Sequence, residues 1–164
     1  MKLRVFFILF YLLSGLAVPA RPLLQNFDKA GFYSAMASGQ LAEINMELSV
    51  VAASSVPEKE AYLGALLMRK AGLLSRPKEK LVTFKSGAIK LETCLAKDTA
   101  NPEYHFLRLI IQEHAPRVVH YNKSTEEDSR DIIRSFPTLS PVLKKAILNY
   151  STHSKLLHER ELNG

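Results

Sequence analysis

The chain has 164 residues, a length typical of one domain, and 47% of them are apolar, as in most globular proteins. Seven glycines are few for this length, and no segment alternates apolar and polar residues as a strand does. The net charge is +6. The lone cysteine, Cys94, excludes an internal disulfide framework and is expected to be a small residue on a helix.

Residues 1–20 have the three parts of a secretory signal peptide. Lys2 and Arg4 form a basic start, residues 5–13 form an apolar run, and residues 14–20 form a cleavage region of mainly small residues. These features predict that the protein is exported.

Cleavage is predicted after Ala20, because Val18 and Ala20 fit the −3 and −1 positions of a signal peptidase site. The apolar stretch of residues 5–18 is shorter than the roughly 20 residues that span a bilayer. No transmembrane span is therefore expected once the signal has been removed. The expected location is the periplasm, or the medium if the source is not Gram-negative.

A linker of residues 21–26 is expected to lead into one helical domain of residues 27–160. The first helices are predicted over residues 27–37, which are rich in small side chains, and over residues 40–53. Gly39 separates them, so they should form a hairpin.

The third helix is predicted over residues 58–72. Ser55 and Glu58 have the spacing of a capping box, and Pro57 suits the first turn. The helix is apolar on several sides, which indicates burial. Gly64 within it costs roughly 1 kcal/mol against alanine, and close approach of another helix would offset that cost.

The fourth helix is predicted to start near Pro77. Its apolar residues recur at intervals of three and four and are expected to form a core stripe with Phe84 central: Leu81, Phe84, Ala88, Leu91 and Leu95. The opposite face carries lysines and should be solvated. Seven basic residues and one acid lie between Arg69 and Lys90, which we interpret as this solvated face rather than a nucleic-acid site.

The fifth helix is predicted to open at Asn101 and Pro102, as a cap and a first-turn proline, and to end at Ala115. A sixth helix is expected from Ser124 to Phe136. Ser124 and Glu127 would form another capping box there, so the acids of that turn are interpreted as capping groups rather than metal ligands.

A last helix is expected to open at Ser140 and to continue through Leu157 before a frayed tail. The fold class is therefore all-α, with six or seven helices packed as antiparallel pairs.

The central part of the chain resembles a stretched tetratricopeptide repeat. The residues that carry the resemblance are Tyr62-Leu63-Gly64-Ala65, Gly72, Phe84, Ala88, Leu91 and Asn101-Pro102. The period from Leu63 to Leu107 is 44 residues rather than the usual ~34, and Arg108 stands where Gly64 would recur. The resemblance implies a groove lined by the first helix of each unit.

Two segments, residues 60–68 and 106–113, also resemble a group of small exported proteins from Bacteroidetes-type bacteria. That group implies no particular activity.

The sequence contains no familiar catalytic, nucleotide-binding or metal-binding motif. The five histidines include no pair spaced four apart, so no catalytic, cofactor-binding or metal-ligating residue is predicted. An enzyme that uses Glu113 or His114 is an alternative. The glycosylation sequons at Asn122 and Asn149 would matter only in a eukaryotic source.

The expected function is a non-catalytic helical-repeat module that binds a protein or peptide partner in the cell envelope. Arg69, His105 and Gln112 are expected to be exposed in the groove and to contact the partner. The alternatives are an unrecognised periplasmic enzyme and a structural envelope-assembly protein without a discrete site.

Overall fold

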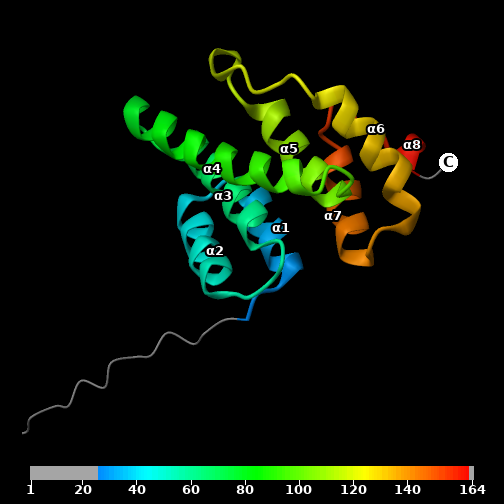
Figure 1. The fold of residues 1–164 in the computed structure, drawn as a ribbon, viewed down its shortest axis with the longest axis horizontal. Coiled ribbons are helices and arrows are strands. Elements are labelled where there is room, and N and C mark those ends of the chain that lie inside the picture. The colour runs from blue at the N-terminus through cyan, green and yellow to red at the C-terminus, as the bar shows by residue number, and fades with distance from the viewer. Residues whose placement is uncertain (1–25, 163–164) are drawn as a thin grey trace, which may run out of the picture.

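The computed structural model describes residues 26–162, and every regular element within them is a helix (Figure 1). The longer helices are α1 (Lys29–Ser38), α2 (Leu41–Ala53), α3 (Lys59–Leu73), α4 (Pro77–Lys97), α5 (Pro102–His114), α6 (Thr125–Ser135) and α7 (Pro141–Ser151). The short ones are the 3₁₀ helices η1 (Arg117–Val119) and η2 (Phe136–Thr138) and the final turn α8 (Glu159–Leu162).

The predicted all-α fold is therefore confirmed. Each of α1 to α7 begins within two residues of the position that the sequence predicts. The predicted signal peptide, residues 1–20, and residues 21–25 of the predicted linker lie outside the described residues. Within residues 26–162, no helix combines the length and the apolar character needed to cross a bilayer.

Three helices start with a side chain that caps them. Asp28 accepts hydrogen bonds from two backbone N–H groups of α1, and Asn101 does the same for α5. Ser140 accepts one from Leu143 at the start of α7. Since each satisfies backbone donors that a helix leaves free, these residues fix where the helices begin.

Neither predicted capping box forms. The residue before α3 is Glu58, at φ −83° and ψ 6°, and the residue before α6 is Ser124, at φ −109° and ψ 9°. Neither side chain bonds to its helix. Ser124 fails because a capping residue needs an extended backbone to aim its side chain at the first turn, and Ser55 fails because α3 begins only at Lys59, four residues later.

The close packing of α3 against α4 depends on two glycines. A Cβ atom added to Gly64 would lie 2.8 Å from the carbonyl oxygen of Gly87, and one added to Gly87 would lie 2.5 Å from the carbonyl oxygen of Gly64. Both distances are too short for any real Cβ contact. The expected close helix approach at Gly64 is therefore confirmed, and Gly87 is its partner.

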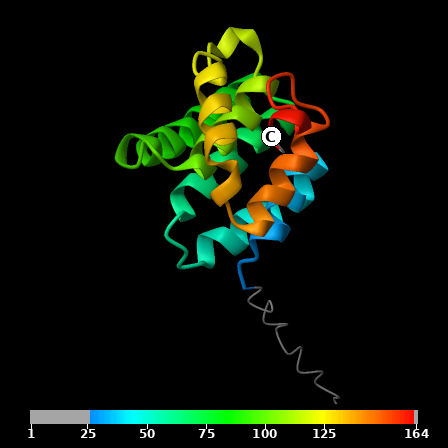
Figure 2. The same cartoon turned by 90° about the vertical axis from the view of Figure 1, so that its right-hand side faces the viewer.

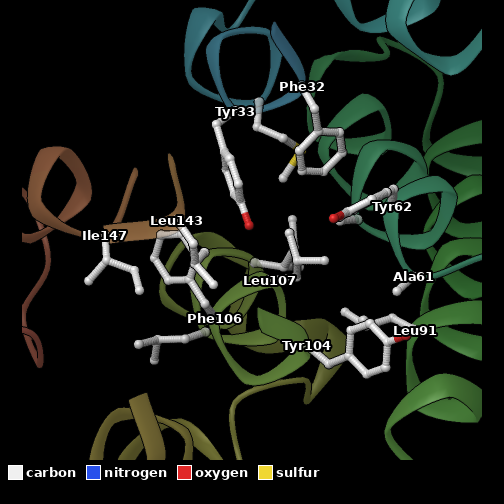
Figure 3. Packing of buried hydrophobic residues seen from close by; sticks show 14 of the residues in the cluster. Phe32, Tyr33, Ala61, Tyr62, Leu91, Tyr104, Phe106, Leu107, Leu143 and Ile147 are labelled. Carbon is white, nitrogen blue, oxygen red and sulfur yellow. The ribbon is translucent and has the colours of Figure 1, made fainter. Parts of the chain in front are cut away.

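The core is formed where α1, α3, α4, α5 and α7 meet (Figure 3). Its largest side chains are at most 1% exposed and include Phe32, Tyr62, Leu91, Phe106, Leu107 and Ile147. The ring centroids of Phe32 and Tyr62 lie 4.5 Å apart. Buried aromatic rings from separate helices thus supply much of the apolar area that stabilises the fold.

One buried carboxylate joins three of these helices. Glu103, at the start of α5, is 6% exposed and accepts hydrogen bonds from the Tyr33 and Tyr62 hydroxyls at 2.8 and 2.9 Å. Lys29 forms an ion pair with it at 2.8 Å. Figure 3 shows the hydroxyl oxygens of Tyr33 and Tyr62 pointing toward one another, and both hydroxyls donate to the same oxygen of Glu103, Oε1. Because the positive end of α5 also favours an acid, the charge is stabilised without solvent.

The predicted central position of Phe84 is wrong. Leu91 and Leu95 of the same stripe are buried, but Phe84 is only partly buried and Leu81 is 46% exposed. The physical reason is the position of the α3–α4 contact at Gly87, because the stripe before that point faces a groove instead of the core.

The C-terminal part folds back over the molecule. Helix α7 lies beside α1, as Figure 2 shows in orange and blue, so the last long helix contacts the first. It ends at Ser151, earlier than predicted, and the expected frayed tail is also wrong. Leu157 is fully buried and Leu162 is 5% exposed, because both pack into the core cluster.

Candidate partner-binding groove

A groove of about 1620 Å³ opens on the surface of the described residues. One face of each of α1, α3, α4, α5 and α7 lines it, together with η1. On α4 the lining residues are Pro77, Lys80, Leu81 and Phe84, and this spacing places them on one side of the helix. Sites for small molecules usually measure ~300–1,000 Å³, so this groove suits a larger ligand.

Apolar side chains form the floor and much of the rim of the groove. Met36, Phe106 and Ile111 are nearly fully buried at the floor. Leu81 and Val142 at the rim are 46% and 38% exposed. Exposed large apolar side chains gathered around one groove are typical of a surface that binds another molecule.

The charged side chains that line the groove are basic. Arg69 of α3, Lys80 of α4 and Lys145 of α7 belong to the lining, which contains no Asp or Glu. Within residues 26–162 none of the three forms a salt bridge, whereas Lys29 and Arg108 do. The residues that line the groove therefore carry a net positive charge.

Arg69 is the one residue of the three predicted for partner contact that lines the groove. Its Nε donates a hydrogen bond to the carbonyl oxygen of Met36 at 3.0 Å, near the end of α1. This bond fixes the stem of the side chain and leaves the two terminal nitrogens of the guanidinium with donors available. Arg69 thus joins α3 to α1 and can still meet a ligand.

The expected exposure of His105 and Gln112 is wrong. They are 4% and 5% exposed, and neither lines the groove. Both lie on α5, which other helices cover on more than one side, as its eight buried residues show. Gln112 has a buried side-chain oxygen, Oε1, without a hydrogen-bond partner among the described residues.

His105 belongs to a buried ionic cluster between α5 and α6. Its Nδ1 lies 2.7 Å from Asp128 Oδ1 and its Nε2 lies 2.8 Å from the Thr99 carbonyl oxygen. Both partners accept hydrogen bonds, so this geometry favours the protonated ring, in which both nitrogens donate. The hydrogen bond to Asp128 is the largest of the effects that raise the pKa of His105.

Asp128 is the centre of this cluster, and the sequence analysis did not find that role. It is fully buried and also accepts hydrogen bonds from Arg108 Nε at 2.8 Å and Nη2 at 2.6 Å. Arg108 reaches Glu92 of α4 at 3.1 Å as well. The acids at the start of α6 had been interpreted as capping groups, but this one holds α6 against α5. A buried acid bonded to two cations is a structural tie rather than a solvated site.

Glu113 and His114, the residues of the alternative enzyme, both lie near the Tyr150 hydroxyl, which is 3.5 Å from His114 Nδ1. Glu113 accepts hydrogen bonds from the Tyr150 hydroxyl at 2.6 Å, from the Ser154 hydroxyl at 2.8 Å and from the Lys155 backbone N–H at 2.7 Å. His114 is exposed, and its Nδ1 lies 2.9 Å from the Ile110 carbonyl oxygen. Both oxygens of Glu113 are thus engaged in holding the segment that follows α7.

Cys94 lies beside a smaller cavity of about 440 Å³ that Tyr104 and Lys90 also line. Burial raises the pKa of its thiol, and the negative charge of Glu60 raises it further. Since the thiolate is the reactive form, this environment makes Cys94 less reactive than a free thiol in water.

The sequence analysis did not single out Lys80 and Lys145. The sequence does show a lysine directly before an apolar lining residue in both places, Lys80 before Leu81 and Lys145 before Ala146. That pattern alone cannot show that α4 and α7 border the same groove, because the two helices are far apart in the sequence.

 The segment between Lys97, where α4 ends, and Pro141, where α7 begins, holds α5 and α6, and their packing brings the two faces together.

Comparison with models of known protein families, with curated proteins and with solved structures found no significant match. Within residues 26–162, no group of three or more His, Cys, Asp or Glu side chains is placed to hold a metal ion. The groove and its chemistry are therefore the features that bear on function.

Proposed function

We propose that this chain is an exported, non-catalytic module that binds a helical segment of a partner protein in the cell envelope. The groove is the observation that carries the proposal. A helix of three turns, about 16 Å long and 10 Å wide, has a volume of roughly 1,300 Å³, which fits within its 1620 Å³. Helices that bind in grooves present an apolar face, and the apolar floor here offers a complementary surface.

Two features of the sequence support the rest of the proposal. The signal-peptide pattern of residues 1–20 favours an exported protein, and the partner would then be an envelope protein. The resemblance to a tetratricopeptide repeat belongs to the same proposal, because α3 with α4 and α5 with α6 are consecutive packed pairs. Proteins built from such pairs commonly bind partners along a concave surface.

The alternatives are less well supported. An enzyme based on Glu113 would need a carboxylate that is free to exchange protons, whereas this one accepts one hydrogen bond from Tyr150 of α7 and two from the segment after α7. A structural protein without a discrete site would not need a large apolar groove, which leaves apolar surface in contact with water.

Photo-crosslinking in the native host tests the proposal with neighbouring residues of α4. A photoreactive amino acid that replaces Leu81, inside the groove, should crosslink to one segment of one protein. One that replaces Val142 should crosslink to the same segment. The matched control places the same amino acid at Val82, which is 59% exposed but outside the groove, and it should not crosslink to that segment.

The proposal is wrong if the variants at positions 81 and 82 crosslink equally to the same proteins. It is also wrong if neither groove position crosslinks to any protein. Adducts spread over many unrelated proteins would indicate nonspecific apolar contact instead of a binding site.

A further inference from the structure

We infer that the helix bound in the groove is acidic, with carboxylates on both sides of its apolar stripe. This inference rests on the proposed function and specifies the chemistry of the partner. It comes from the charges of the lining residues, which are independent of the groove's size and apolar floor.

The positive charge comes from three helices. Arg69 belongs to α3, Lys80 to α4 and Lys145 to α7, so the cations are distributed around the groove and not gathered on one element. Lys90 of α4 lies outside the groove and forms an ion pair with Glu60 at 2.5 Å. Carboxylates of a ligand would supply the partners that the groove cations do not have within residues 26–162.

The polar residues of the lining agree with this assignment. They include Ser34, Ser38, Asn149 and Tyr150, and none of them carries a negative charge near neutral pH. A basic helix would place its lysines against Arg69, Lys80 and Lys145, and like charges in contact oppose binding. The groove thus discriminates against basic helices as well as favouring acidic ones.

The dimensions indicate the length of the segment. The lining face of α7 runs from Pro141 to Tyr150, roughly 14 Å along the helix at 1.5 Å per residue. A ligand helix of about three turns would match that face. An apolar residue every three or four positions would contact the floor at Phe106 and the rim at Leu81 and Val142.

The inference can be tested with designed helical peptides of about three to four turns and no partner from the host. The acidic peptide has a leucine stripe flanked by glutamates, and the basic peptide has lysine at every glutamate position. A third peptide keeps the glutamates and replaces the leucines with serines. Binding to the protein is measured by fluorescence anisotropy at low and at high salt.

The acidic peptide should bind roughly tenfold more tightly than the basic one at low salt, because each exposed ion pair contributes up to about fivefold. Salt should reduce this difference, since it screens exposed charges. The serine peptide should bind much more weakly than the acidic one at either salt concentration, because the floor is apolar.

A charge reversal then locates the effect. The double variant Lys80→Glu with Lys145→Glu should lose the preference for the acidic peptide and gain affinity for the basic one. The matched control is Lys85→Glu with Lys155→Glu, which has the same change in net charge at two exposed lysines outside the groove. It should retain the preference of the unchanged protein.

The outcomes separate the two proposals. Equal binding of the acidic and basic peptides, with the serine peptide failing to bind, overturns the acidic partner and leaves helix binding in the groove intact. Failure of all three peptides overturns the inference, and the crosslinking experiment then decides the proposed function by itself. Oleate is added as a competitor of the acidic peptide. If oleate binds more tightly and displaces the peptide, the inference is also overturned, because the occupant would then be an anionic lipid.

Discussion

Substitution of Gly64 by alanine tests the close contact between α3 and α4. The new Cβ atom would lie 2.8 Å from the Gly87 carbonyl oxygen and 2.9 Å from the backbone nitrogen of Leu91. Both neighbours are backbone atoms of α4, so no side-chain rotation can relieve the contact. The helices would have to separate by roughly 0.6 Å to restore ordinary van der Waals distances.

Two effects of opposite sign decide the magnitude. Alanine is a better helix former than glycine by ~1 kcal/mol. Overpacking of a tight contact usually costs ~1–3 kcal/mol and sometimes more, and here the separation would loosen neighbouring contacts along the whole interface. The gain offsets part of the cost, and because both contacts are with backbone atoms we expect Gly64→Ala to lower the free energy of unfolding by about 1–2 kcal/mol.

Gly72 provides the matched control, because it lies in the same helix and a Cβ atom added there would meet nothing within 4 Å. Gly72→Ala should raise the free energy of unfolding by about 0.4–1 kcal/mol, since only the helix preference and the unfolded chain change. Urea unfolding followed by circular dichroism measures both variants. The reasoning is refuted if Gly64→Ala is as stable as the unchanged protein, or if Gly72→Ala is equally destabilised.

The remaining predictions concern the core and one buried charge. Phe106→Ala should lower the free energy of unfolding by about 3–5 kcal/mol because Phe106 is 1% exposed, whereas Phe84→Ala should cost only about 1–2 kcal/mol because Phe84 is partly buried at the groove. Equal losses in urea unfolding would contradict this. The pKa of His105 is raised in the folded state, because the protonated ring bonds to Asp128. This pair therefore contributes its full stability below the unfolded pKa of ~6.5, and the contribution is lost as pH rises through the higher folded pKa. His105→Gln should remove that pH dependence from urea unfolding, and an unchanged pH profile would show that the pair with Asp128 is not its source.

The sequence by itself determined the fold class and the helix positions. Apolar residues spaced three and four apart, first-turn prolines such as Pro77 and Pro102, and the cap at Asn101 act within a few residues of chain. A local pattern is sufficient to predict them for that reason. The close approach at Gly64 was also predictable, because a glycine inside a buried helix needs a compensating contact.

The tertiary structure alone decided which apolar stripes are buried and which polar residues are exposed. His105 and Asp128 are 23 residues apart, and their bond depends on the docking of α6 against α5. Phe84 has the same helical spacing as the buried Leu91, yet it faces the groove because α3 crosses α4 at Gly87. Helical periodicity defines a face of each helix, but only the packing of the helices decides whether that face meets the core, the solvent or a groove.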